Sequence, residues 1–136
     1  MDGSQWLPYQ PATFPTPPFP EYVSGHSTYS AAAARILELW TGSDQFGDSV
    51  TLAAGSSQIE PGITPAKPVT LKWETFTEAA NEAGMSRRYG GIHFARADLA
   101  GRKLGRLVAD NAWAKAQNYF DGTAIPSVQQ LTATNQ

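Results

Sequence analysis

The sequence has no cysteine, few charged residues and no long apolar run. Without cysteine, the chain cannot form disulfides, zinc–thiolate sites, iron–sulfur clusters or a thiol nucleophile. Lys and Arg number 10 against 12 Asp and Glu, and the net charge of −2 gives no reason to expect nucleic-acid or membrane-surface binding. No segment approaches the roughly 18 apolar residues of a membrane span. We therefore expect neither a nucleic-acid partner nor a membrane span.

The length of 136 residues corresponds to about one domain, and 41% hydrophobic residues are typical of a globular chain. We therefore expect residues 1–136 to form a single domain. Residues 1–5 lack the basic and apolar regions of a secretory signal, and the cellular compartment stays open.

Proline is concentrated near the N-terminus. Six of the ten prolines fall within residues 8–20, where they fix the backbone and remove hydrogen-bond donors. Aromatic residues alternate with these prolines, which favours an arm lying against a protein surface. We predict an extended, proline-rich arm over residues 1–22.

Three segments have the composition and periodicity of helices. Residues 28–40 carry four consecutive alanines, with Ser24, Ser27 and Thr28 as possible caps and Gly42 at the end. Residues 76–86 follow a Thr75–Glu78 capping box. The third and longest helix is predicted over residues 95–119, with small residues at helical spacing against which another helix could pack: Gly101, Gly105, Ala109, Ala112 and Ala116.

Residues 42–72 are rich in glycine and proline and predict one long loop. Two short β-branched runs within this region, 49–52 and 69–73, indicate a short β-hairpin. The polar residues 122–136 are predicted to form a tail. The expected fold class is mainly α: a helical bundle with a proline-rich arm, one long loop and a short hairpin.

Both histidines lie beside glycine, just before predicted helices. His26 follows Ser24 and Gly25, and His93 follows Gly90, Gly91 and Ile92. The start of a helix offers unpaired backbone N–H groups and the positive end of the helix dipole, which together favour anions. Residues 87–106 contain six Lys or Arg against one acidic residue, Asp98. The pattern predicts a site for a tetrahedral oxyanion, with Arg87, and secondarily Arg88, supplying guanidinium groups.

Simpler interpretations exist for the same residues. A histidine at the start of a helix often serves only as a cap or a core residue, and a basic helix face is often merely solvated. Ser24 lies in Val-Ser-Gly-His, which differs from the Gly-x-Ser-x-Gly pattern of serine hydrolases. Glu78 and Glu82 have no histidine nearby, so they indicate an exposed helix face in place of a metal site.

Two segments together resemble a known superfamily. Residues 18–27, Pro-Phe-Pro-Glu-Tyr-Val-Ser-Gly-His-Ser, and residues 86–94, Ser-Arg-Arg-Tyr-Gly-Gly-Ile-His-Phe, are similar to the second and third signature motifs of vanadium-dependent haloperoxidases and PAP2 (type 2 phosphatidic acid phosphatase) enzymes. The resemblance spans roughly residues 16–112 and is strongest to bacterial haloperoxidases.

The resemblance implies a role for each matching residue. His93 would bind vanadate in a haloperoxidase or act as the nucleophile of an acid phosphatase, and His26 would be the acid–base group. Arg87, Ser24 and the Gly25 amide would hold the equatorial oxygens of the oxyanion. The implied cofactor is vanadate, which phosphate could replace, and the implied substrates are peroxide and halide or a phosphomonoester.

The chain also departs from the superfamily pattern. The position four residues after His93, where the phosphatases have aspartate, is Ala97, and Asp98 comes one residue later. No Lys or Arg precedes Ser24, so the first motif, with its Lys and Arg-Pro, has no counterpart. Losing two charge-assisted hydrogen bonds, each worth roughly 1.5 to 3 kcal/mol, predicts vanadate binding no tighter than high micromolar.

Because of these missing cations, we expect the C-terminal half of a larger catalytic domain. An N-terminal half or another copy of the chain would then complete the fold and the site. A non-catalytic interaction domain that retains the fold is the third alternative, beside the haloperoxidase and the acid phosphatase.

Overall fold

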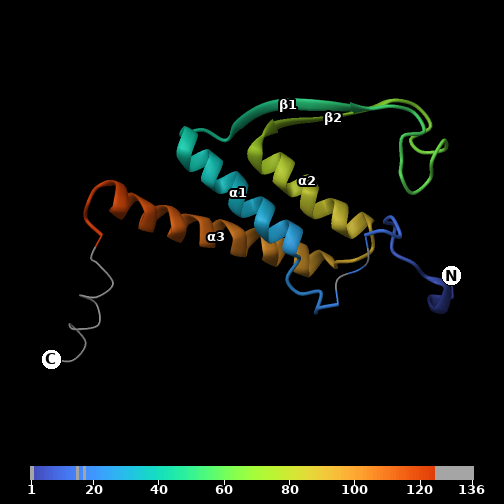
Figure 1. The fold of residues 1–136 in the computed structure, drawn as a ribbon, viewed down its shortest axis with the longest axis horizontal. Helices are drawn as coiled ribbons and strands as arrows, with labels where there is room; N and C mark the ends of the chain where they lie inside the picture. The colour runs from blue at the N-terminus through green and yellow to red at the C-terminus, as the bar shows by residue number, and fades with distance from the viewer. Residues whose placement is uncertain (1, 15, 17, 125–136) are drawn as a thin grey trace.

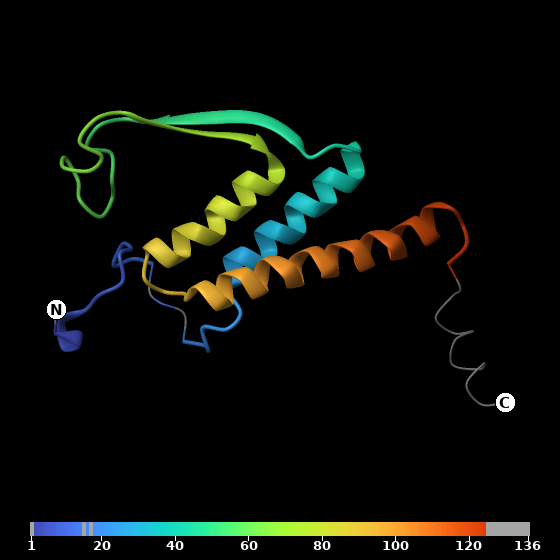
Figure 2. The same ribbon diagram turned by 180° about the vertical axis from the view of Figure 1, so that it is seen from behind.

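The computed structural model describes residues 2–14, 16 and 18–124 (Figures 1 and 2). The fold is mainly helical with one two-stranded sheet, and the predicted fold class is confirmed. Within the described part of the chain, none of the helices combines the length and apolar character that a membrane crossing requires. The elements, in chain order, are η1 (Gly3–Gln5), α1 (Gly25–Thr41), β1 (Gln45–Leu52), β2 (Val69–Thr75), α2 (Phe76–Tyr89) and α3 (Ala95–Phe120).

Helix α1 begins three residues earlier than predicted. Ser24 is the N-cap, and its hydroxyl accepts a hydrogen bond from the backbone N–H of Ser27. The helix ends at Gly42 as predicted, because this residue adopts the left-handed conformation with a φ of 74°. Gly25 and His26 therefore lie inside the first turn of α1.

The hairpin connects the end of α1 with the start of α2 (Figure 1). Strands β1 and β2 pair antiparallel, with Leu52 opposite Val69 and Thr51 opposite Thr70. Both strands are longer than predicted. The extra residues of β1 include Gly47, whose φ of 71° accompanies a shift in register between Gln45 and Asp48.

The predicted capping box of α2 is confirmed. Thr75 accepts from the N–H of Glu78, and the Glu78 carboxylate accepts from the N–H of Thr75. The helix continues to Tyr89, three residues beyond its predicted end. Gly90 keeps a right-handed backbone with a φ of −66°, and the chain leaves the helical path only at Gly91, where φ is 73°.

Helix α3 packs on α1 through glycine. A Cβ added to Gly105 would collide with the carbonyl oxygen of Thr28, and one added to Gly101 would lie 2.8 Å from the carbonyl oxygen of Ser24. The two helices can therefore approach this closely only with glycine at both positions. The predicted small-residue face is buried as far as Ala109, whereas Ala112 and Ala116 retain solvent exposure.

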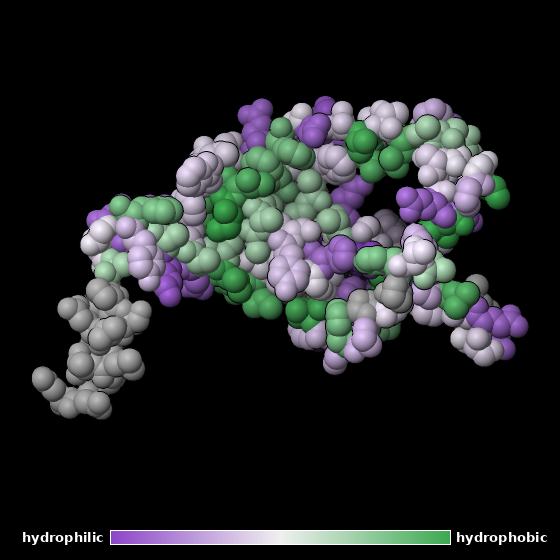
Figure 3. Space-filling model, viewed as in Figure 1, coloured by the Kyte–Doolittle hydropathy of each residue, from purple (hydrophilic) through white to green (hydrophobic). Residues whose placement is uncertain are grey.

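The buried apolar side chains of the described residues are all alanines. They are Ala31, Ala34, Ala80, Ala97 and Ala109. Large apolar side chains lie at the surface, and Figure 3 shows apolar residues gathered over α1 and its surroundings. Leu37, Trp40 and Phe46 are 44%, 70% and 40% exposed, far more than is typical of a completed core.

The arm lies against the turn between α2 and α3. The Tyr9 N–H donates to the carbonyl of Gly90 at 2.9 Å, and the Trp6 ring leaves no room for a Cβ on Gly91. The arm is not extended throughout, because Asp2 caps the short 3-10 helix η1. Of the predicted tail, residues 122–124 are described, and the remainder lies outside the described residues.

Candidate functional site

The turn between α2 and α3 holds Arg87 and His93 together. The carbonyl of Arg87 accepts hydrogen bonds from the N–H groups of Ile92 at 3.1 Å and His93 at 3.4 Å. The left-handed Gly91 allows the chain to reverse within this short segment. The end of α2 and the residue preceding the start of α3 are thereby joined at one place.

His26 lies in the first turn of α1 and retains solvent exposure. Partial burial of its ring lowers the pKa of His26, and positive charge on Arg87 and His93 lowers this pKa further. His26 therefore lies within electrostatic range of Arg87 and His93, with which the sequence predicts it to share a site. The turn joins Arg87 and His93 directly.

The Arg87 guanidinium has an unused hydrogen-bond donor. Its Nη2 donates to Oε1 of Gln10 at 3.4 Å, and its Cζ lies 5.5 Å from the centre of the Phe14 ring. Its Nε is buried and has no hydrogen-bond partner. Burial also lowers the pKa of Arg87. A buried donor without an acceptor costs free energy, so this nitrogen favours an incoming anion.

The contacts from Gln10 and Phe14 were not predicted from the sequence. Both residues belong to the proline-rich arm, and no motif marks them as site residues. The aromatic content of the arm indicates a surface contact without indicating that Arg87 lies on that surface.

His93 has a carboxylate partner that the sequence analysis missed. Its Nδ1 lies 3.3 Å from Oε2 of Glu21, and the same oxygen accepts from the N–H of Phe94 at 3.3 Å. Glu21 lies within the first resembling segment, three residues before Ser24. The position of Glu21 close to the Ser24-Gly25-His26 motif was the only sign of its role in the sequence. Its contact with His93 depends on the fold and could not be predicted from the sequence.

Asp98 lies in a separate buried cluster, which we call the Asp98 cluster: Ser24, Ser27, Arg88, Asp98 and Arg102. Arg102 donates two hydrogen bonds of 2.7 Å to the Asp98 carboxylate, and Arg88 forms a 3.7 Å ion pair with it. Burial raises the pKa of Asp98, but the hydrogen bonds from Arg102 and Ser27 and the charges of Arg102 and Arg88 outweigh it and leave this pKa below its ordinary value. Arg88, the secondary guanidinium candidate, is thus paired with Asp98, the secondary site candidate next to the position where the phosphatases have aspartate.

Ser24 is completely buried at the edge of this cluster. The Ser27 hydroxyl lies 2.8 Å from Oδ1 of Asp98 and 2.9 Å from the Ser24 hydroxyl. The Ser27 hydroxyl is the donor in both contacts, and the Ser24 oxygen also accepts from the backbone N–H of Ser27 at 3.4 Å. The Ser24 oxygen is thus an acceptor within the Asp98 cluster.

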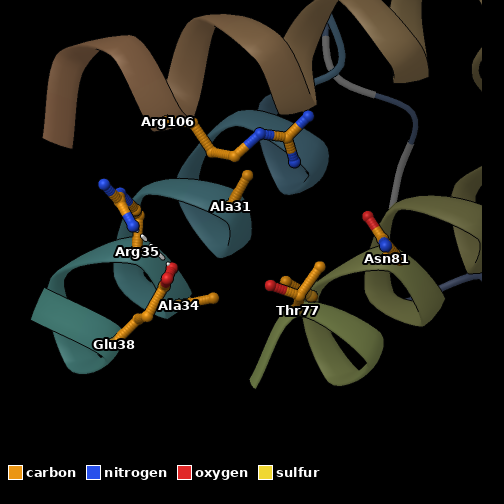
Figure 4. A pocket seen from close by; sticks show the side chains of 8 residues that line it. Ala31, Ala34, Arg35, Glu38, Thr77, Asn81 and Arg106 are labelled. Atoms are coloured by element: carbon orange, nitrogen blue, oxygen red, sulfur yellow. Dashed lines mark ion pairs between the residues drawn. The ribbon is translucent and has the colours of Figure 1, made fainter. Parts of the chain in front are cut away.

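A small cavity lies elsewhere, between the three helices (Figure 4). It is lined by Ala31, Ala34, Arg35, Glu38, Thr77, Ala80, Asn81 and Arg106. Its volume is about 10 Å³, close to the space that one water molecule needs. This cavity contains none of the predicted site residues and belongs to the packing of the bundle.

The fold and the site define the class of the protein. A helical bundle that brings two histidines and a half-buried arginine to adjoining helix ends is typical of the vanadium haloperoxidase and PAP2 superfamily. A family model described as "VCPO second helical-bundle domain" matches residues 1–122. The chain belongs to this family.

Solved structures of bacterial vanadium enzymes resemble the chain. A holo-type bacterial vanadium-dependent chloroperoxidase has 30% identity and a TM-score of 0.71 over 79% of this chain and 22% of its own. An apo-type bacterial vanadium-dependent chloroperoxidase has 29% identity and a TM-score of 0.79 over 89% and 25%. A bacterial vanadium-dependent iodoperoxidase has 36% identity and a TM-score of 0.54 over 79% and 22%.

The chain therefore spans a quarter or less of the length of these structures. The search of curated proteins found no match.

Proposed function

We propose that the chain forms the oxyanion-binding part of a vanadium-dependent haloperoxidase, with vanadate held at His93. One observation carries the proposal: the Nε of Arg87 is buried without a hydrogen-bond partner beside the two histidines. A negatively charged oxygen would satisfy this donor and offset the positive charge gathered there. Membership of the family supports vanadate as that anion.

The residues present fit such a group. His93 offers a ring nitrogen, and Arg87 offers a half-buried guanidinium with a buried, unpaired Nε. Gly25 and His26 offer backbone N–H groups of a first helical turn, which lack intrahelical partners. Vanadate, when bound, supplies the Lewis-acid centre that activates hydrogen peroxide toward halide. Because its pKa is lowered, His26 is neutral near pH 7 and can accept a proton from a group bound beside it. We assign Ser24 to holding the start of α1.

We further propose that residues 1–136 act as a single domain within a larger catalytic unit. The first-motif cations have no counterpart among residues 1–23, and large apolar side chains lie exposed on α1 and the hairpin. A second helical segment, or another copy of the chain, would cover this surface and supply positive charge. The proposed substrates of the assembled enzyme are hydrogen peroxide and a halide.

Titration of orthovanadate into the chain, followed by calorimetry and ⁵¹V NMR, tests the oxyanion site. We expect high-micromolar affinity, with a loss of tenfold or more in Arg87→Gln because a charge-assisted hydrogen bond is removed. Arg106→Gln is the matched control, since it removes the same charge at the cavity between the helices, which contains none of the predicted site residues (Figure 4). Equal losses of vanadate affinity in both variants would show that only the overall charge of the protein matters. Submicromolar binding to the wild type would contradict the expectation that the site is incomplete.

An acid phosphatase with His93 as nucleophile is the second candidate function. The Glu21 carboxylate on His93 favours it, because such a partner makes an imidazole a better nucleophile. At acidic pH, where His26 is protonated, His93 would form a bond to phosphorus while the substrate oxygen leaves with a proton from His26. The neutral His26 would then accept a proton from the water that hydrolyses the phosphohistidine.

Two assays of the assembled protein separate the candidates. A haloperoxidase halogenates monochlorodimedone only with vanadate, peroxide and halide present, whereas a phosphatase hydrolyses p-nitrophenyl phosphate and is inhibited by vanadate. Vanadate binding with neither activity would identify the third alternative, a non-catalytic domain.

A further inference from the structure

Glu21 contacts His93 in a way that restricts the protonation of the imidazole. Its Oε2 lies 3.3 Å from Nδ1 of His93 and 3.3 Å from the N–H of Phe94. The His93 side chain is 8% exposed, so water has little access to the ring as a competing partner. Within the described ranges 2–14, 16 and 18–124, no other carboxylate forms a hydrogen bond with either ring nitrogen of His93.

The chemistry of the two groups sets the direction of this hydrogen bond. An ionised carboxylate accepts hydrogen bonds and donates none. Nδ1 of His93 must therefore carry the proton that Glu21 accepts, and the neutral ring then has its lone pair on Nε2. The partner of one ring nitrogen thus decides which nitrogen is free to bind.

We propose that Glu21 is a positioning residue for the oxyanion site: it holds His93 in the Nδ1-protonated form and leaves Nε2 as the nitrogen that binds the oxyanion. This inference rests on the function proposed above for His93. A carboxylate behind a ligating histidine fixes the orientation of the ring and raises its basicity.

The position of Glu21 in the fold supports this role. Glu21 belongs to the segment before α1, and its carboxylate reaches the residues just before α3. Nearby, the N–H of Ser24 donates to the carbonyl of Ala97 at 3.2 Å, so two hydrogen bonds join the approach to α1 with the start of α3. The position four residues after His93 is the buried Ala97, and Asp98 is paired with Arg102 and Ser27. Glu21, which lies before α1 and not in α3, is therefore the carboxylate placed to orient the His93 ring.

A purely structural role is the competing explanation, because Glu21 also caps the N–H of Phe94 at the start of α3. The two roles predict different behaviour of the imidazole. A cap stabilises the helix and has no effect on the tautomer of His93, whereas a positioning residue controls that tautomer.

The test is ¹⁵N NMR of the two imidazoles, recorded at a fixed pH above their titration range. We expect His93 to be Nδ1-protonated in the wild type and to shift toward the Nε2-protonated form in Glu21→Ala. Glu21→Gln should retain the wild-type form, since its amide oxygen can still accept from Nδ1. Glu38→Gln is the control, because Glu38 is also 34% exposed and pairs with Arg35 on α1.

Orthovanadate titration of the same variants completes the test. Glu21→Ala should weaken binding about tenfold and Glu21→Gln less than threefold, as expected for loss and retention of the partner of a ligating histidine. An Nε2-protonated His93 in the wild type, or an unchanged tautomer in Glu21→Ala, would overturn the proposal. If the wild type did not bind vanadate but Glu21→Ala still changed the tautomer, the proposed oxyanion function would be wrong. The control of the His93 tautomer by Glu21 would still be supported.

Discussion

The Ser27 hydroxyl lies 2.8 Å from the Asp98 carboxylate, and this contact connects the start of α1 with the first turns of α3. The same Ser27 hydroxyl also donates to the Ser24 oxygen at 2.9 Å, so the N-cap of α1 belongs to the same hydrogen-bonded cluster. These contacts fix the first turn of α1 next to α3.

Replacing Asp98 with Asn should strongly destabilise the fold. The substitution removes the negative charge that neutralises Arg102 and Arg88, and breaking a buried ion pair costs about 3 kcal/mol or more. Urea unfolding measures this loss. Asp110→Asn is the matched control on the same helix, since Asp110 is 46% exposed and its pair with Arg35 contributes at most about 1 kcal/mol. Equal losses in the two variants would show that the Asp98 cluster does not hold the helices.

Replacing Ser24 with Ala should lower stability without weakening oxyanion binding. Loss of an N-cap costs about 1 kcal/mol, and the Ser24 side chain is completely buried and leaves no exposed surface for an anion. Chemical denaturation should therefore show the loss, while the orthovanadate affinity of the folded protein changes less than twofold. A tenfold weaker affinity would mean that Ser24 turns to donate to the anion.

Replacing Gly105 with Ala should separate α1 from α3. A Cβ at this position would collide with the Thr28 carbonyl, and overpacking of this kind costs about 3 kcal/mol. Gly25→Ala provides the comparison, because no atom lies within 4 Å of a Cβ added there and alanine favours a helix. Thermal unfolding should show a large loss for the first variant and little change for the second. Similar results for both would contradict the close crossing.

Local sequence signals predicted the helices well and predicted their ends less well. The Thr75–Glu78 capping box and Gly42 act between neighbouring residues, so the sequence reveals them directly. Helix α2 continued past its predicted end because a pair of glycines does not show which one leaves the helix, and Gly91 does so here.

The site was predictable where it depends on motifs and hidden where it depends on tertiary contacts. His26, Arg87 and His93 lie in two recognisable segments, and the fold places His26 within electrostatic range of the other two. Glu21, Gln10 and Phe14 reach the site only after the arm has folded back over the turn between α2 and α3. The pairing of Asp98 with Arg102 likewise follows from burial, which a local count of charges does not reveal.

The titration of His26 gives a pH-dependent prediction with a definite sign. Its pKa in the folded protein is below the ordinary value of 6.5, so the unfolded chain binds more protons as the pH falls below about 6.5. The free energy of unfolding should therefore decrease from pH 6.5 downward until His26 is protonated in the folded state as well. His26→Gln should remove this part of the pH dependence.

Arg87→Gln should raise the pKa of His26, measured by NMR titration, because a nearby positive charge is lost. The pKa should move only part of the way back to its ordinary value, since partial burial remains the largest cause of the shift. A pKa of 6.5 or higher in the wild type would show that partial burial and the charges of Arg87 and His93 do not act on His26.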